Sequence, residues 1–122
     1  MLAHRGHPWI VETLSLIRKH PHLYADISAL YYRPWQFYHA LVLAMEHGVL
    51  HQPLSGSDDP VTTPRSTMAA LAKVNSVAEG TGMPWISVER IEEISHRDIL
   101  GLLGILGSFR LHRISRHVII CA

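Results

Sequence analysis

Two residues of this sequence combine a reactive side chain with a position at the end of an extended segment. His4 ends a short apolar stretch at residues 2–4, and Asp58 follows a second extended stretch at residues 53–57. A carboxylate can accept a proton from water, and a histidine can steady the charge that develops on a substrate oxygen. The structural alternatives are a turn aspartate that caps the loop before Pro60 and an exposed histidine close to the N-terminus.

Three other polar residues are secondary candidates. Tyr31 and Arg33 follow the extended segment at residues 23–28 and could line a pocket for an anionic substrate; the alternative is that they are exposed loop residues. Asp26 lies within that segment, on the face that it shares with Ser28. It is expected to be either a polar residue near the pocket or a hydrogen-bonded structural carboxylate.

These candidates need a framework that brings the ends of extended segments together. Strands are expected at residues 2–4, 23–28 and 53–57, and helices alternate with them. The helix starts are marked by Pro8, Pro34, Thr63 with Pro64, Ser87 and Asp98, and the last helix is expected to run through Ile105. The order β-α-β-α-β-α-α favours right-handed βαβ units and a parallel sheet. The apolar stripe of Trp35, Tyr38, Val42 and Met45 predicts that the second helix packs this face into the interior.

Composition excludes several classes of protein. With 48% hydrophobic and 17% charged residues, the 122-residue chain has enough apolar material for one core. The apolar run at residues 99–107 is too short to span a membrane, and the start of the chain lacks the apolar region of a signal peptide. One cysteine excludes a disulfide framework and suits a reducing cytoplasm. A net charge of +1 gives no reason to expect a nucleic-acid or membrane partner.

Four segments, taken in order, carry a resemblance. They are residues 3–9 (AHRGHPW), 23–28 (LYADIS), 56–60 (GSDDP) and 91–103. At this spacing they resemble the C-terminal part of the amidohydrolase-related metal-dependent hydrolases, a branch of the amidohydrolase superfamily that includes the aminocarboxymuconate-semialdehyde decarboxylase relatives. The resemblance implies an α/β fold, namely strands six to eight and the closing helices of a (β/α)8 TIM barrel, over residues 1–104. Residues 105–122 form an unmatched basic tail.

The resemblance also implies roles for the two leading candidates. His4 matches the family histidine that lies beside the metal and helps to hold or polarise the attacking water or the substrate. Asp58 matches the aspartate that binds the metal or takes a proton from metal-bound water. The implied cofactor is a divalent metal, with zinc the first expectation. The implied reaction is attack of metal-activated water on a C–N or C–O bond of a small molecule, although some relatives decarboxylate.

Part of the family's metal site has no counterpart in this sequence. The family's first strand supplies a His-x-His pair, and its fifth strand supplies a further histidine or a modified lysine. His20-Pro21-His22 has the spacing of the pair, but it falls where a helix ends. Only three residues precede His4, whereas strands usually have about five or six, so we expect the chain to begin inside a fold. The isolated chain is therefore expected to be a weak or inactive catalyst.

Two alternatives remain open at this point. The chain could be a non-catalytic interaction module that completes a barrel with a second copy of itself or with a complementing chain, because the edge of a short sheet is a template for pairing. It could also be a truncated gene product without an independent role.

Overall fold

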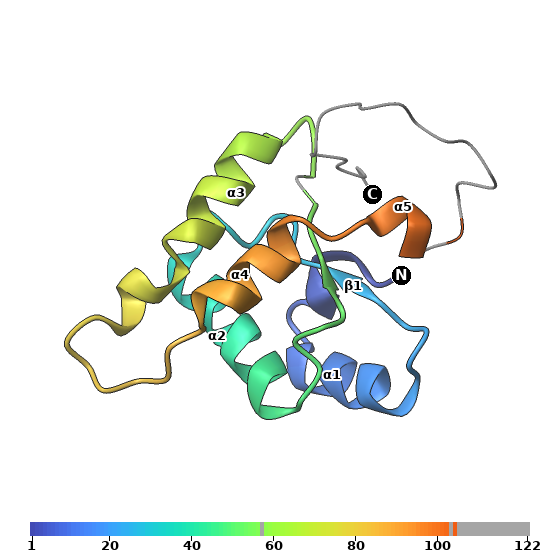
Figure 1. Ribbon diagram of the computed structural model, residues 1–122, viewed down its shortest axis with the longest axis horizontal. Helices are drawn as coiled ribbons and strands as arrows, with labels where there is room; N and C mark the ends of the chain where they lie inside the picture. The colour runs from blue at the N-terminus through green and yellow to red at the C-terminus, as the bar shows by residue number, and fades with distance from the viewer. Residues whose placement is uncertain (57, 103, 105–122) are drawn as a thin grey trace.

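The computed structural model describes residues 1–56, 58–102 and 104. These residues form a small mixed α/β domain that is mostly helical and contains a two-stranded parallel sheet (Figure 1). The elements in chain order are η1 (Ala3–Gly6), α1 (Ile10–Lys19), β1 (Ala25–Asp26), α2 (Pro34–Glu46), β2 (Pro53–Leu54), α3 (Pro64–Ala72), η2 (Val74–Ala78), α4 (Val88–Ser95) and α5 (Ile99–Leu102).

The sheet confirms the predicted parallel arrangement, but its strands are shorter than expected. β1 pairs with β2 in a register that places Ala25 opposite Pro53, and Leu2 forms a parallel bridge with Ala25 on the other side. The expected strand at residues 2–4 is wrong beyond Leu2. His4 and Arg5 both have a φ of 50°, and this left-handed backbone turns residues 3–6 into the short 3₁₀ helix η1.

Most predicted helix starts are confirmed by their caps. The side chain of Thr63 accepts a hydrogen bond from the backbone N–H of Ser66, and Ser87 caps α4 in the same way. Asp98 Oδ1 accepts from the backbone N–H of Gly101 at 3.0 Å. The expected start at Pro8 is wrong, because the backbone of Trp9 is not helical and α1 begins at Ile10.

The core lies between the sheet and the helices. α1 contributes Leu14 and Ile17, and α2 contributes Phe37, Tyr38, Ala40, Leu41 and Ala44, all of them buried. The prediction that Trp35 packs inside is wrong. The buried face of α2 leaves Trp35 53% exposed, and its ring stacks on His39 with ring centres 5.6 Å apart.

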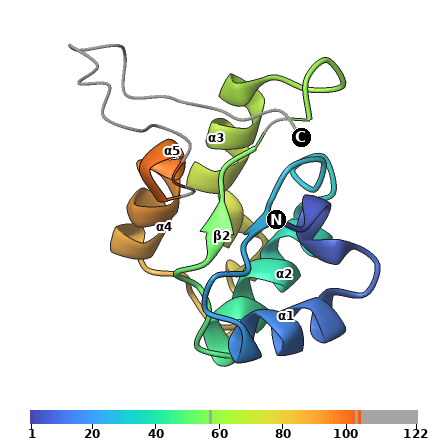
Figure 2. The same ribbon diagram turned by 90° about the vertical axis from the view of Figure 1, so that its right-hand side faces the viewer.

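The helices flank the short sheet. In Figure 2, α4 and α5 lie on one side of β2, and α1 and α2 lie on the other. No barrel is formed by the residues that the structure describes, which supply two strands and one further bridge. The same part of the chain holds no helix that is long and apolar enough to cross a membrane. The tail at residues 105–122, and with it the predicted helix end at Ile105, lies outside the described residues.

Candidate functional site

Three residues with left-handed backbone follow the three paired segments. His4 (φ 50°) comes after Leu2, Ala29 (φ 54°) after β1, and Asp58 (φ 63°) after β2. A positive φ is uncommon for residues other than glycine, and such strained positions concentrate at functional sites. Ligands of parallel sheets bind at the carboxyl ends of the strands, which is where these residues stand. The carboxyl edge of the sheet is therefore the candidate functional site.

A buried carboxylate organises this edge. Asp26 Oδ1 accepts hydrogen bonds from the backbone N–H of His4 at 3.1 Å, from the backbone N–H of Ser28 at 3.0 Å and from the Ser28 hydroxyl. These bonds tie the loop after Leu2 to the end of β1. The other carboxylate oxygen of Asp26 is buried and has no hydrogen-bond partner among the described residues.

Ser28 fixes the orientation of the His4 ring. The imidazole Nδ1 lies 2.8 Å from Ser28 Oγ and 3.2 Å from the Ser28 carbonyl oxygen. A carbonyl oxygen only accepts, and the Ser28 hydroxyl proton is already directed at Asp26, so Nδ1 must carry the hydrogen. In the neutral ring the lone pair is then on Nε2.

The free nitrogen of His4 faces the second candidate. His4 Nε2 lies 4.0 Å from Asp58 Oδ1, and the two side chains are 37% and 26% exposed. The backbone carbonyl of Asp58 accepts from the N–H of Val61 at 2.8 Å, so a tight turn holds the aspartate in place. The structure thus brings His4 and Asp58 together at a surface that water and small molecules can reach.

Gly56 explains why β2 can approach this site so closely. A Cβ atom at position 56 would lie 3.3 Å from Ser28 Cβ, which is tighter than most such contacts, and 3.5 Å from Asp26 Cβ, which is ordinary van der Waals contact. A larger residue would therefore require Ser28 to shift by a few tenths of an ångström. Gly56, two residues before Asp58, thus allows β2 to pack closely against the end of β1.

The fit of a metal ion to this site is partial. Nε2 of His4 and Oδ1 of Asp58 are suitable donors, and two tetrahedral zinc ligands lie about 3.4 Å apart, so a small side-chain adjustment would serve. Zinc sites of enzymes use three protein ligands. The described residues contain no group of three or more His, Cys, Asp or Glu side chains that could hold a metal ion. His4 and Asp58 alone would form a weak site.

The two residues expected to bind substrate lie on the loop that follows β1. Arg33 is exposed, donates to Gln36 Oε1 at 3.4 Å and lies over the Tyr32 ring. Tyr31 is half-buried and lines a separate hollow beside α2 and η2. Within the described part of the chain, neither Arg33 nor Tyr31 forms a hydrogen bond, ion pair or ring contact with His4 or Asp58.

The sequence analysis assigned no part in the site to Ser28, and it did not predict the burial of Arg5. The alternation of residues 23–28 placed Asp26 and Ser28 on one face, so the signal for Ser28 was present. No feature of the sequence indicated that Arg5 would be buried. Its side chain is 1% exposed, and its Nε and Nη1 atoms have no hydrogen-bond partner among the described residues. Burial lowers the pKa of Arg5 to about 10.

Comparisons with protein-family models, with curated proteins and with solved structures found no match to this chain.

Proposed function

We propose that the chain is part of a metal-dependent hydrolase of the amidohydrolase type, with His4 and Asp58 as two of its metal ligands. The observation that carries the proposal is the 4.0 Å approach of His4 Nε2 to Asp58 Oδ1, on a ring whose other nitrogen is held by Ser28. Metal-ligating histidines commonly donate their second ring N–H in this way, which fixes the tautomer. Three parallel segments joined through α1 and α2 are compatible with the C-terminal part of a (β/α)8 barrel.

Each residue of the site has a separate task in this proposal. A divalent metal, zinc first, would supply an activated water, since it lowers the pKa of bound water to about 7. Ser28 and Asp26 hold the His4 ring so that Nε2 points to the site. Asp58 either binds the metal or accepts the proton of the water that attacks a C–N or C–O bond. Arg33 and Tyr31 are proposed to contact a small anionic substrate, and decarboxylation is the alternative reaction.

The test of this proposal is a double-mutant cycle in metal binding. We expect zinc and manganese affinities of wild type to be weak, because two ligands are fewer than the usual three. Asp58→Ala and His4→Gln should each weaken binding about tenfold or more, and the double variant should lose little further, because both residues serve one ion. Asp59→Ala removes the adjacent exposed carboxylate and is the matched control.

The same metal-binding experiment can also contradict the proposal of a common site. Additive losses, or an equal loss in Asp59→Ala, would show that the ten histidines and scattered carboxylates of the chain bind the ion without a common site. Rapid turnover of an ester, amide or carboxylated substrate by the purified chain would contradict the expectation of a weak catalyst.

The proposed cytoplasmic location rests on the single cysteine of the sequence.

A second candidate function is self-association, and a specific surface favours it. Val11 and Leu16 of α1 are half exposed, and two surface hollows of about 390 and 370 Å³ share Val11 and Glu12 along this helix. The second hollow is also lined by Trp35. The first hollow combines the two apolar side chains with Glu12, Ser15 and Lys19, and exposed apolar side chains rimmed by polar ones are typical of protein interfaces. A second copy of the chain is the partner we propose.

Light scattering after size exclusion tests this candidate directly. Wild type should be a dimer at about 100 µM, because standard interfaces with micromolar affinity are saturated at that concentration. Leu16→Glu should give a monomer, and Val61→Glu, at a more exposed valine of a different loop, should not. A monomeric wild type that unfolds cooperatively would contradict self-association and would count against the interaction module.

A further inference from the structure

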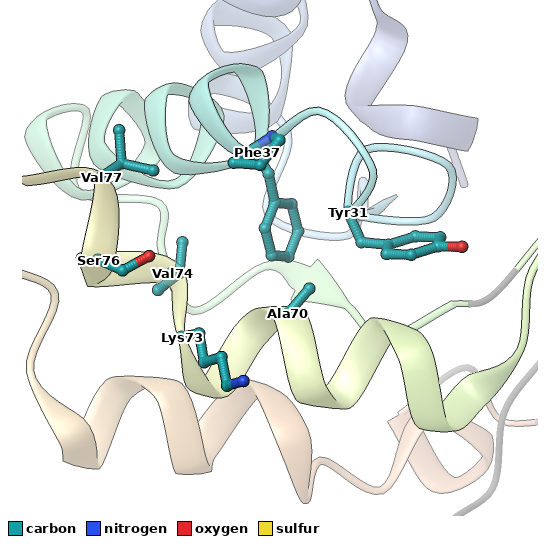
Figure 3. A pocket seen from close by; sticks show the side chains of 8 residues that line it. Tyr31, Phe37, Ala70, Lys73, Val74, Ser76 and Val77 are labelled. Atoms are coloured by element: carbon teal, nitrogen blue, oxygen red, sulfur yellow. The ribbon is translucent and has the colours of Figure 1, made fainter.

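A cavity beside α2 contains neither His4 nor Asp58, and Tyr31 is the one residue of its lining that the proposed function uses. It has a volume of about 230 Å³ and is formed where α2, α3, η2 and the loop at residue 31 meet (Figure 3). Its lining residues are Tyr31, Pro34, Phe37, Ala70, Lys73, Val74, Ser76 and Val77. Neither the resemblance nor the proposed function gives this cavity a role.

Local sequence explains why there is space at this point. α3 ends at Ala72, and Lys73 breaks the helix before η2 begins at Val74, so the chain bends beside α2. Ala70 offers only a methyl group opposite the ring of Phe37, which points from α2 toward Ala70 and Val74 (Figure 3). A small residue at a helix bend thus leaves a hollow against a large aromatic side chain.

The walls of the cavity are apolar and its ends are polar. Phe37, Val74 and Val77 form the interior, and the Tyr31 ring lies beside Phe37 with its hydroxyl pointing away from η2 (Figure 3). Lys73 and Ser76 occupy the opposite end, on η2 and the residue before it. Lys73 makes no ion pair within residues 1–56, 58–102 and 104, and both residues are exposed. The Lys73 ammonium group points away from Phe37 (Figure 3), and rotation of this exposed side chain would bring it to the same end as the Ser76 hydroxyl.

We propose that this cavity binds a small aromatic monocarboxylate. The volume exceeds the roughly 150 Å³ that accommodates benzene in an apolar protein cavity, so a ring with a short side chain fits. The ring packs against Phe37 and Tyr31, since aromatic pairs add favourable offset or edge contacts. After rotation of the exposed Lys73 side chain, the carboxylate accepts charge-assisted hydrogen bonds from Lys73 Nζ and a hydrogen bond from Ser76 Oγ. One cation and one hydroxyl match a monoanion better than a phosphate.

Binding is tested with phenylacetate and with phenylacetamide, which has the same shape without the charge. Titrations followed by amide chemical shifts should show phenylacetate binding with a Kd of about 1 mM, as expected for a ligand of about ten heavy atoms. The shifted amides should be those of α3, η2 and residue 31. Phenylacetamide should bind about tenfold more weakly.

Variants at each end of the cavity separate charge from packing. Lys73→Gln should reduce phenylacetate affinity five- to tenfold and leave phenylacetamide unchanged, whereas Lys19→Gln, at the only other lysine, should change neither. Ala70→Leu should block both ligands by filling the hollow. If Ala70→Leu fails to fold, the amide chemical shifts of wild type still show whether phenylacetate binds in this cavity.

Three results would overturn the inference: no binding at 10 mM, equal affinity for the acid and the amide, or shifts that map to another part of the fold. Because neither of the proposed metal ligands, His4 and Asp58, lines the cavity, metal binding and phenylacetate binding can fail independently.

Discussion

The buried guanidinium of Arg5 makes a quantitative prediction about stability. Its side chain is 1% exposed, and two of its nitrogens have no hydrogen-bond partner in the described part of the chain. Burial lowers the pKa of Arg5 from its ordinary value to about 10. Since one pKa unit is worth about 1.4 kcal/mol, the folded state carries a penalty of about 3 kcal/mol for keeping this charge.

The variant Arg5→Met removes the charge and keeps an unbranched apolar stem of similar length. We expect it to raise the free energy of unfolding at pH 7 by about 1–3 kcal/mol, because replacing uncompensated buried charge with apolar atoms of similar volume is often stabilising. Urea unfolding at 25 °C measures this change. Arg33→Met, at an exposed arginine, is the control and should stay within about 0.5 kcal/mol of wild type.

The pH dependence follows from the same lowered pKa. Above pH 10 the folded state releases the Arg5 proton, while the unfolded state, in which Arg5 has its ordinary higher pKa, keeps it. Stability of wild type therefore rises with pH in that window relative to Arg5→Met. The difference in the free energy of unfolding between wild type and Arg5→Met should be constant from pH 6 to 9 and should become smaller above pH 10.

A loss of stability greater than about 1 kcal/mol in Arg5→Met would refute the reasoning. It would show that the guanidinium is paired in the folded protein, because breaking a buried pair costs about 3–5 kcal/mol. Arg5→Lys is the control for the charge, since it keeps a buried cation and should show no gain in the free energy of unfolding.

Three further substitutions test two glycine positions and one side-chain hydrogen-bond pair, and urea or thermal unfolding measures all three. Gly6→Ala should lower the free energy of unfolding by more than about 3 kcal/mol, because a Cβ would overlap the Thr13 side chain at a position whose φ is +67°. Gly48 has a φ of +70° but open space around it, so Gly48→Ala should lower the free energy of unfolding by only about 1 kcal/mol. Asn75→Ala should cost about 1–3 kcal/mol, because the Asn75 amide donates to the backbone carbonyl of Ile86 at 2.8 Å and accepts from its N–H at 3.0 Å. Equal effects of the two glycine substitutions, or an unchanged midpoint for Asn75→Ala, would contradict these expectations.

The sequence by itself determined the features that depend on neighbours within a few residues. The caps Thr63 and Ser87 bond to backbone groups three residues on, so the signals for helix starts are local. Gly48, with a φ of +70°, ends α2 for the same kind of reason. The alternation of extended and helical segments also indicated the parallel order of the paired segments.

Tertiary structure decided what depends on residues far apart in the chain. The His4 tautomer is set by Ser28, 24 positions away, and the left-handed backbone of His4 shortened the first strand to one bridge. Local patterns cannot specify such contacts, because a side chain has the same sequence neighbours whichever distant segment packs on it. The exposure of Trp35 and the burial of Arg5 have the same origin: the packing of the other elements, and no local periodicity, determined which surface was covered.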